Sequence, residues 1–132
     1  METTDLTGEL REQLERERAL IACAYLYGSR ATGQARNDSD VDLAILFRHP
    51  QKPALVNPAA SLARRLEQAI RRPIDLIDVE QAPVDLVHRI LRDGILLLDA
   101  VPERRIAFEV DARNRYFDLL PYLREYRRSS AA

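Results

Sequence analysis

Four short apolar runs divide this chain, and polar, helix-like stretches separate them. Each run is rich in aliphatic residues and is short enough to form one β-strand. The runs are Ala19–Tyr27, Val41–Phe47, Ile74–Val79 and Ile95–Leu98. Strands that alternate with helices favour one sheet with helices packed on it, because each element buries its apolar side against another layer. The sequence therefore predicts an α/β (α+β) fold, with a small mixed β-sheet of about four strands flanked by helices.

Helix signals lie between and beyond these runs. Asparagine is a favoured cap, proline is tolerated at the first helical position, and glycine often follows the last turn. Pro121 removes a backbone donor inside the last segment, so we expect a kink there. No repeat or linker interrupts residues 1–132, which we expect to form a single domain. The expected helical segments are a first helix capped by Thr4 or Thr7, a short turn at Ala31–Arg36, a helix from Asn57 to Pro73, a helix from Pro83 to Gly94, and a long helix over 102–128.

Composition limits the environment and the partners. The 132 residues carry a formal net charge of -1 and are 46% hydrophobic. A charge so close to zero attracts neither nucleic acid nor a membrane surface strongly, so direct nucleic-acid binding is not expected. No run approaches the ~18 apolar residues that cross a bilayer, and the acidic start differs from a signal peptide. Cys23 is the only cysteine, which predicts a buried thiol and no intrachain disulfide. We expect a cytoplasmic protein.

Acidic residues cluster where the second apolar run begins. Asp40 and Asp42 are two residues apart, so both carboxylates would project from one face of the strand. Two such carboxylates repel each other unless a cation lies between them, and Mg²⁺ prefers oxygen ligands shared with phosphates. A two-metal site needs a third carboxylate. The third run offers Asp75 and Asp78 on opposite faces, and we favour Asp75 because it lies at the start of that strand.

A Gly-Ser turn directly follows the first run. Gly28 would let backbone amides turn toward an anion, and the hydroxyl of Ser29 can donate to a phosphate oxygen. Two arginines could add charge-assisted bonds, a second glycine would allow a close turn, and a later serine would brace the loop. Spacing alone equally allows an ordinary edge strand with a solvated end. The residues expected at a nucleotide site are Gly28, Ser29, Arg30, Gly33, Arg36 and Ser39.

The whole string GSRATGQARNDSDVDL resembles the signature of the DNA polymerase β-type nucleotidyltransferases, in particular the minimal nucleotidyltransferases. The segment VHRILRDGILLL and the C-terminal stretch ERRIAFEVDARNRYFDLLPYLREYRR resemble later segments of family members that are paired with HEPN-domain proteins. The resemblance implies the polymerase β-type nucleotidyltransferase fold. It also implies Mg²⁺-dependent transfer of AMP from ATP to a hydroxyl, with release of pyrophosphate. The matching signature residues are Gly28, Ser29, Gly33, Ser39, Asp40, Asp42, Leu43 and Asp75.

The same resemblance implies roles and a partner. Asp40 and Asp42 would bind both metal ions, and Asp75 would ligate the catalytic one and help to activate the acceptor hydroxyl. Paired family members are antitoxins that modify a tyrosine of an HEPN ribonuclease, so an HEPN toxin and a hetero-oligomer with it are expected. Two other functions stay open: an antitoxin that acts by docking alone, and nucleotidyl transfer to a small molecule.

Aromatic residues concentrate in the last helical segment. Together with nearby leucines, they form an apolar stripe that is too broad for one face of a helix. Packing on the chain's own sheet and docking of a partner are both open. We favour docking on one side, because Tyr, Phe and Arg are enriched at interfaces. His49 and His88 are too isolated to form a metal site. The residues expected to bind a partner are Tyr116, Phe117, Tyr122 and Tyr126.

Overall fold

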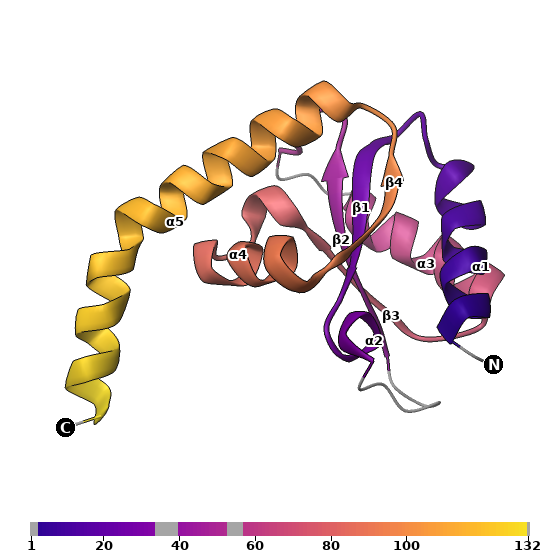
Figure 1. Cartoon of the computed structure of the whole chain (residues 1–132). Helices are drawn as coiled ribbons and strands as arrows, with labels where there is room; N and C mark the ends of the chain where they lie inside the picture. Colours follow the sequence, from indigo (N-terminus) through magenta and orange to yellow (C-terminus); the bar gives the residue numbers. More distant parts are fainter. Residues whose placement is uncertain (1–2, 34–39, 53–56, 132) are drawn as a thin grey trace.

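The computed structural model describes residues 3–33, 40–52 and 57–131, and it places a layer of helices on each side of one sheet (Figure 1). Each apolar run that predicts a strand forms one. The elements are α1 (Thr3–Glu15), β1 (Ile21–Tyr27), α2 (Ser29–Thr32), β2 (Val41–Phe47), α3 (Pro58–Ile70), β3 (Ile74–Asp78), the 3-10 helix η1 (Val79–Gln81), α4 (Val84–Asp93), β4 (Ile95–Asp99) and α5 (Pro102–Ala131).

The four strands are ordered β3-β2-β1-β4. β1 pairs antiparallel with β2 and with β4, whereas β2 and β3 run parallel. A parallel pair needs a crossover connection, and α3 provides it between β2 and β3. Both kinds of pairing occur in one sheet, so the predicted fold class is confirmed.

The alternation of side chains along β2 divides the core between two faces. Its odd-numbered residues are buried in a cluster with leucines of α1 and α3. Ala44 and Leu46 are buried in a second cluster, which includes Val87 and Ile90 of α4. Figure 1 shows the same layers, with α1 and α3 on one side of the sheet and α4 and the start of α5 on the other. By this alternation, Asp42 belongs to the face that α4 covers.

The predicted cap of the first helix is wrong. α1 begins at Thr3, so Thr4 and Thr7 both lie within the helix. Leu6 is already buried in the core one turn later. Burial of the first apolar position therefore extends the helix beyond the residues that favour a cap, because packing outweighs capping preference in a short helix.

Strand and turn boundaries shift by a few residues. β1 begins at Ile21 rather than Ala19, because 16–20 form turns instead of extended chain. α2 begins at Ser29 rather than Ala31, and the part of the predicted turn over 34–36 lies outside the described residues. Val79 leaves the sheet and opens η1. Each shift occurs at a strand end, where local turn hydrogen bonds compete with pairing.

The start of α3 follows its prediction. The side-chain oxygen of Asn57 accepts hydrogen bonds from the backbone N–H of Ala59 at 2.9 Å and of Ala60 at 3.4 Å, with Pro58 at the first helical position. Replacing Asn57 by alanine is expected to lower the free energy of unfolding by about 1 kcal/mol, because two backbone donors lose their acceptor. Urea denaturation of Asn57→Ala and Asn57→Asp checks this, since aspartate keeps the acceptor and should be near wild type.

Side chains of α5 tie its first half to the sheet. The Tyr25 hydroxyl on β1 donates to the Glu109 carboxylate at 2.7 Å, and the Arg104 guanidinium donates to the carbonyl of Phe47 at 2.7 Å. The helix continues through Pro121, and Figure 1 shows its axis bending in the second half, as expected where proline removes a backbone donor. That half extends beyond the rest of the molecule.

Cys23 is fully buried, and burial raises the pKa of its thiol to about 12. The prediction of a buried thiol is confirmed, and the raised pKa disfavours the reactive thiolate. Within the described residues, none of the helices combines the length and the apolar character that a membrane span needs.

Candidate active site

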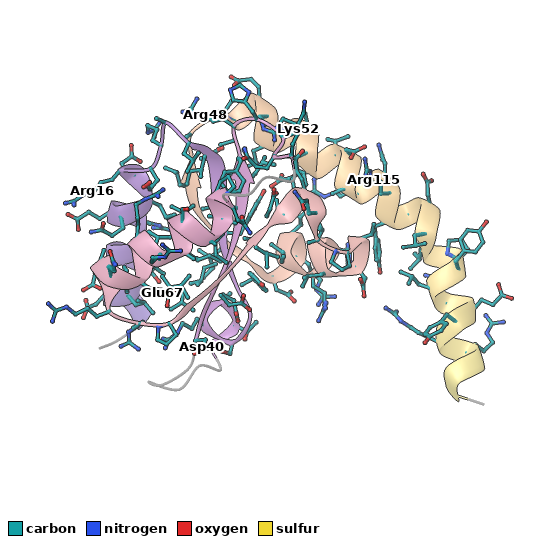
Figure 2. All side chains as sticks on the ribbon, turned by 180° about the vertical axis from the view of Figure 1, so that it is seen from behind. Arg16, Asp40, Arg48, Lys52, Glu67 and Arg115 are labelled. Atoms are coloured by element: carbon teal, nitrogen blue, oxygen red, sulfur yellow. The ribbon has the colours of Figure 1, made fainter. Side chains whose placement is uncertain are left out.

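Strand register brings two of the three predicted carboxylates side by side. Asp42 is the second residue of β2, and it pairs with Tyr27 of β1 on one side and with Asp75 of β3 on the other. Parallel strands in register place equivalent side chains on the same face, so Asp42 and Asp75 are neighbours at the sheet surface. Asp40 is exposed and lies just before β2. Figure 2 shows Asp40 at the α2 end of the sheet, opposite the end where Arg48 and Lys52 lie.

These carboxylates repel one another electrostatically. The pKa of Asp42 is raised above its usual value, first by burial and then by the charges of Asp75 and Asp40. Burial raises the pKa of Tyr27 to about 12, with further contributions from Asp42 and Asp75, and the charge of Arg89 acts in the opposite direction. This corner of the sheet thus concentrates negative charge that a bound cation would offset.

The Gly-Ser turn touches the acidic group. Gly28 has a φ of 75°, in the region that favours glycine. A Cβ added at Gly28 would lie 2.5 Å from Oδ2 of Asp42, so the backbone passes closer to this carboxylate than any side chain permits. Gly33 ends α2 with a φ of 78°, and its backbone N–H donates to the carbonyl of Ser29. The two glycines therefore set the path of the turn beside Asp42.

The other residues expected at the nucleotide site divide into three groups. Ser29 opens α2 and is partly exposed. Arg30 is only 4% exposed, so protein atoms cover its guanidinium in this conformation. Arg36 and Ser39 lie outside the described residues. The roles of all four in binding a nucleotide stay predictions.

The structure separates Asp75 from Asp78. Asp78 pairs with Ile45, three residues farther along the strands than the Asp42–Asp75 pair. Its carboxylate accepts a hydrogen bond from the backbone N–H of Glu80 at 3.0 Å and so caps η1. Asp78 thus has a structural contact away from Asp42, and Asp75 is the carboxylate of β3 that lies beside it.

The donor set fits Mg²⁺ by its chemistry, although the side chains have not converged. Among the described residues, no three His, Cys, Asp or Glu side chains lie together closely enough to hold a metal ion. Asp40 and Asp75 are both exposed, so their carboxylates can change rotamer without displacing the core. That Asp40, Asp42 and Asp75 hold the metal ions stays a prediction.

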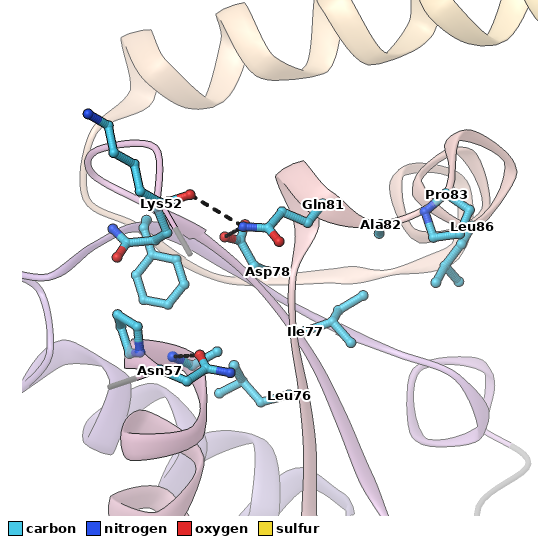
Figure 3. A pocket seen from close by; sticks show the side chains of 13 residues that line it. Lys52, Asn57, Leu76, Ile77, Asp78, Gln81, Ala82, Pro83 and Leu86 are labelled. Carbon is cyan, nitrogen blue, oxygen red and sulfur yellow. Dashed lines mark hydrogen bonds between the residues drawn. The ribbon is translucent and has the colours of Figure 1, made fainter. Parts of the chain in front are cut away.

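Two cavities lie near opposite ends of β2. One of about 340 Å³ adjoins the turn and is lined by Tyr27, Gly28, Ser29, Thr32, Leu86, Arg89, Ile90 and Asp93. A larger one, of about 480 Å³, reaches from the start of α3 past the end of β3 to the start of α4. Figure 3 shows Lys52, Asp78 and Gln81 around the larger cavity, with Asp78 at the far end of β3 from Asp75. The smaller cavity is the one next to the predicted site, because Gly28 lines it and also lies against Asp42.

The sequence analysis missed two residues that the fold brings to this corner, namely Tyr27 and Arg89. Tyr27 precedes the Gly-Ser turn and shares the strand face of Tyr25, a position that strand alternation could have identified. Arg89 comes from α4, more than 40 residues away in sequence, and no local pattern distinguishes it from the other arginines.

Tyr116 differs from the other predicted partner-binding residues. Its ring stacks on that of His88 of α4, with centroids 3.6 Å apart. Phe117, Tyr122 and Tyr126 are 67%, 70% and 72% exposed. Tyr116 thus helps to join α5 to α4, whereas the other three side chains are mostly exposed.

Comparisons with known structures agree with this fold. A chain of a toxin–antitoxin complex with AMP-PNP is similar, with a TM-score of 0.76 and 23% identity over 96% of this chain and 98% of that chain. A chain of the complex between a tri-AMPylated Shewanella oneidensis HEPN toxin and an MNT antitoxin has a TM-score of 0.73 and 19% identity, covering 99% and 100%. A protein described as a minimal nucleotidyltransferase has a TM-score of 0.56 and 27% identity, covering 72% and 95%.

Sequence comparison gives the family. No curated protein sequence matches this chain significantly. The family model described as "Polymerase beta, Nucleotidyltransferase" matches residues 9–103, a span that includes the Gly-Ser turn and all three aspartates. Since that match covers well over half of the chain, the protein belongs to the polymerase beta nucleotidyltransferase family.

Proposed function

We propose that this protein is an antitoxin that transfers AMP from ATP to a tyrosine hydroxyl of a partner HEPN toxin in a Mg²⁺-dependent reaction. The observation that carries the proposal is the pairing of Asp42 with Asp75 beside the Gly28 turn. Metal-binding carboxylates next to a glycine turn suit phosphoryl transfer, since the phosphates can contact both. The partner is inferred from the similar complexes of HEPN toxins with antitoxins.

Each group has a defined task in this reaction. Asp40, Asp42 and Asp75 would hold Mg²⁺, which would supply positive charge to polarise the α-phosphate and to offset charge on the leaving group. The acceptor oxygen attacks the α-phosphorus, the bond from that phosphorus to the bridging oxygen of the β-phosphate breaks, and pyrophosphate leaves. The Asp75 carboxylate would accept the hydroxyl proton first and then release it to solvent. Gly28 and Ser29 orient the phosphates against Asp42.

The exposed half of α5 supports a docking role. Phe117, Tyr122 and Tyr126 are large, exposed and carried by the part of the helix that extends beyond the sheet (Figure 1). Exposed aromatics of this kind mark protein interfaces more often than isolated aliphatic residues do. A partner held here could offer its hydroxyl to the site without a second domain in this chain.

Phe117→Asp is expected to weaken the complex with the HEPN partner by at least about tenfold, because it places a charge in the apolar contact. The melting temperature should stay close to wild type, since the side chain is exposed. Isothermal titration calorimetry with the purified partner measures the affinity. Arg64→Ala, on an exposed position of α3, is the control and should bind like wild type. Equal affinity of Phe117→Asp and wild type would remove α5 from the interface.

Intact-mass spectrometry tests the proposed reaction. The partner toxin is incubated with this protein, ATP and Mg²⁺, and its mass is compared with that of the untreated toxin. A gain of one or more AMP units supports transfer to protein and counts the additions. A stable complex without a mass gain would point instead to an antitoxin that acts by docking alone. If the toxin neither gains mass nor forms a complex with this protein, transfer to a small-molecule acceptor becomes the function to test.

A further inference from the structure

One wall of the cavity beside the Gly-Ser turn is formed by residues outside the set expected to bind phosphate. Gly28, Ser29 and Thr32 form its turn side, and residues of α4 form the opposite side. Leu86 and Ile90 on that helix are apolar, and Arg89 brings a positive charge to this wall. Asp93 also lines the cavity, and its carboxylate is paired with the Arg92 guanidinium. A cavity of about 340 Å³ is in the size range of sites that enclose small ligands.

Arg89 differs from the neighbouring Arg92 because it forms no ion pair among the described residues. The Arg92 guanidinium forms an ion pair with Asp93 at 2.8 Å. Within the described part of the chain, Arg89 makes no ion pair or hydrogen bond. Its side chain is exposed, so holding it in one place costs side-chain entropy that nothing in the protein itself offsets. An anionic ligand in the cavity would supply that partner.

The position of Arg89 relates it to the metal-binding carboxylates. Tyr27 links the two, since it pairs with Asp42 across β1 and β2 and lines the cavity together with Arg89. Gly28 lines the cavity and also contacts Asp42. Asp42 therefore lies behind the Gly28 wall of the cavity, and Arg89 lies on the opposite wall, with the turn between them. A triphosphate matches this polarity, because its inner phosphate needs the metal and its outer phosphates need further positive charge.

We infer that Arg89 is a phosphate-positioning residue that binds the β- and γ-phosphates of ATP, and so holds the pyrophosphate that leaves. The inference rests on the proposed function and adds a residue of α4 to the phosphate site. The buried Arg30 is less suited to this task, because protein covers its guanidinium. Arginine suits it, because its planar fork binds two phosphate oxygens at once. The segment of partner that carries the acceptor is a competing occupant, and the test separates the two.

Equilibrium binding of ATP, pyrophosphate and AMP to the full chain, with Mg²⁺ and without a partner, tests the assignment. Arg89→Ala should raise the Kd for ATP and for pyrophosphate by about ten- to a hundredfold, the effect of losing charged hydrogen bonds. Binding of AMP should change less than twofold, because AMP lacks the outer phosphates. Arg89→Lys should restore part of the affinity. Arg64→Ala, at an exposed position of α3 away from the cavity, is the control and should bind all three ligands like wild type.

The outcomes distinguish this inference from the function on which it rests. If the wild-type chain binds no ATP, the proposed function fails first. If the wild type binds ATP and Arg89→Ala binds it equally well, the assignment of Arg89 is wrong while the function stands. An equal loss of AMP and ATP binding would place Arg89 at the nucleoside instead. If Arg89→Ala binds ATP like wild type but binds the purified HEPN partner more weakly in calorimetry, the cavity holds the acceptor segment of the partner instead. Circular dichroism confirms that each variant is folded.

Discussion

Asp42→Asn is expected to reduce nucleotidyl transfer by at least about 10³-fold, equivalent to roughly 4 kcal/mol in the barrier. Asparagine keeps the shape of the side chain and removes the charge that would bind the metal. The rate of AMP incorporation into the partner, measured with radiolabelled ATP, gives the size of the loss. Transfer within tenfold of wild type would show that Asp42 does not hold the catalytic metal.

The same substitution should leave the fold intact and can stabilise it when Mg²⁺ is absent. The pKa of Asp42 is raised in the folded protein by burial and by the charges of Asp75 and Asp40. A group with a raised folded pKa binds its proton more tightly in the folded state, so stability falls as pH rises from the unfolded pKa through the folded one. Above the folded pKa, the charged Asp42 carboxylate destabilises the fold by its full amount. At pH 7 with EDTA, Asp42→Asn should therefore melt at the wild-type temperature or above it.

Asp78→Asn is the matched control for Asp42→Asn. It removes one carboxylate from the strand that carries Asp75, and asparagine keeps an oxygen that can accept from Glu80 N–H. Because Asp78 lies three residues beyond the Asp42–Asp75 pair, transfer should stay near wild type. Asp75→Asn should lose activity as Asp42→Asn does. The reverse pattern would exchange the roles of Asp75 and Asp78.

Gly28→Ala is expected to have the second largest effect, reducing transfer by about 10²-fold and the free energy of unfolding by about 1–3 kcal/mol. Two causes act together. The backbone has a φ of 75°, and the new Cβ would lie 2.5 Å from Oδ2 of Asp42. Relief of that contact has to displace either the turn or the carboxylate, and a shift of about 1 Å at a reacting centre is costly.

Gly33→Ala separates the two causes. Gly33 has a φ of 78°, but a Cβ added there would meet nothing within 4 Å. Backbone strain alone should therefore lower the free energy of unfolding of Gly33→Ala by about 1–2 kcal/mol, measured by urea denaturation. Its loss of transfer activity should be smaller than that of Gly28→Ala. If Gly28→Ala and Gly33→Ala lose equal activity, contact with Asp42 is not what makes Gly28 necessary.

Local patterns predicted the elements well where one physical signal dominates. The alternation of apolar residues gave β2 its bounds and assigned its faces, because each side chain packs with one of two separate clusters. Asn57 and Pro58 fixed the start of α3, since the cap is a contact within four residues. The cap of α1 was predicted wrongly, because burial of Leu6 in the tertiary core decides where that helix begins.

Residues of the candidate site were harder to assign, because strand pairing is not a local property. Spacing could place Asp75 and Asp78 on opposite faces, but only register shows which one lies beside Asp42. Arg30 looked suited to phosphate from its sequence position, yet tertiary packing covers it. Tyr116 belongs to an aromatic stripe in sequence, and stacking on His88 then commits it to the contact between α4 and α5.

The extended second half of α5 sets how far from the sheet a bound partner is held. Glu109 is bonded to Tyr25 on the sheet, and Phe117 and Tyr126 follow eight and 17 residues later along the helix. At about 1.5 Å of rise per residue, these rings lie up to roughly 12 and 26 Å along the helix from that anchor. A partner bound by these rings is therefore held to one side of the sheet, and its acceptor hydroxyl has to reach from α5 back to the turn at Gly28.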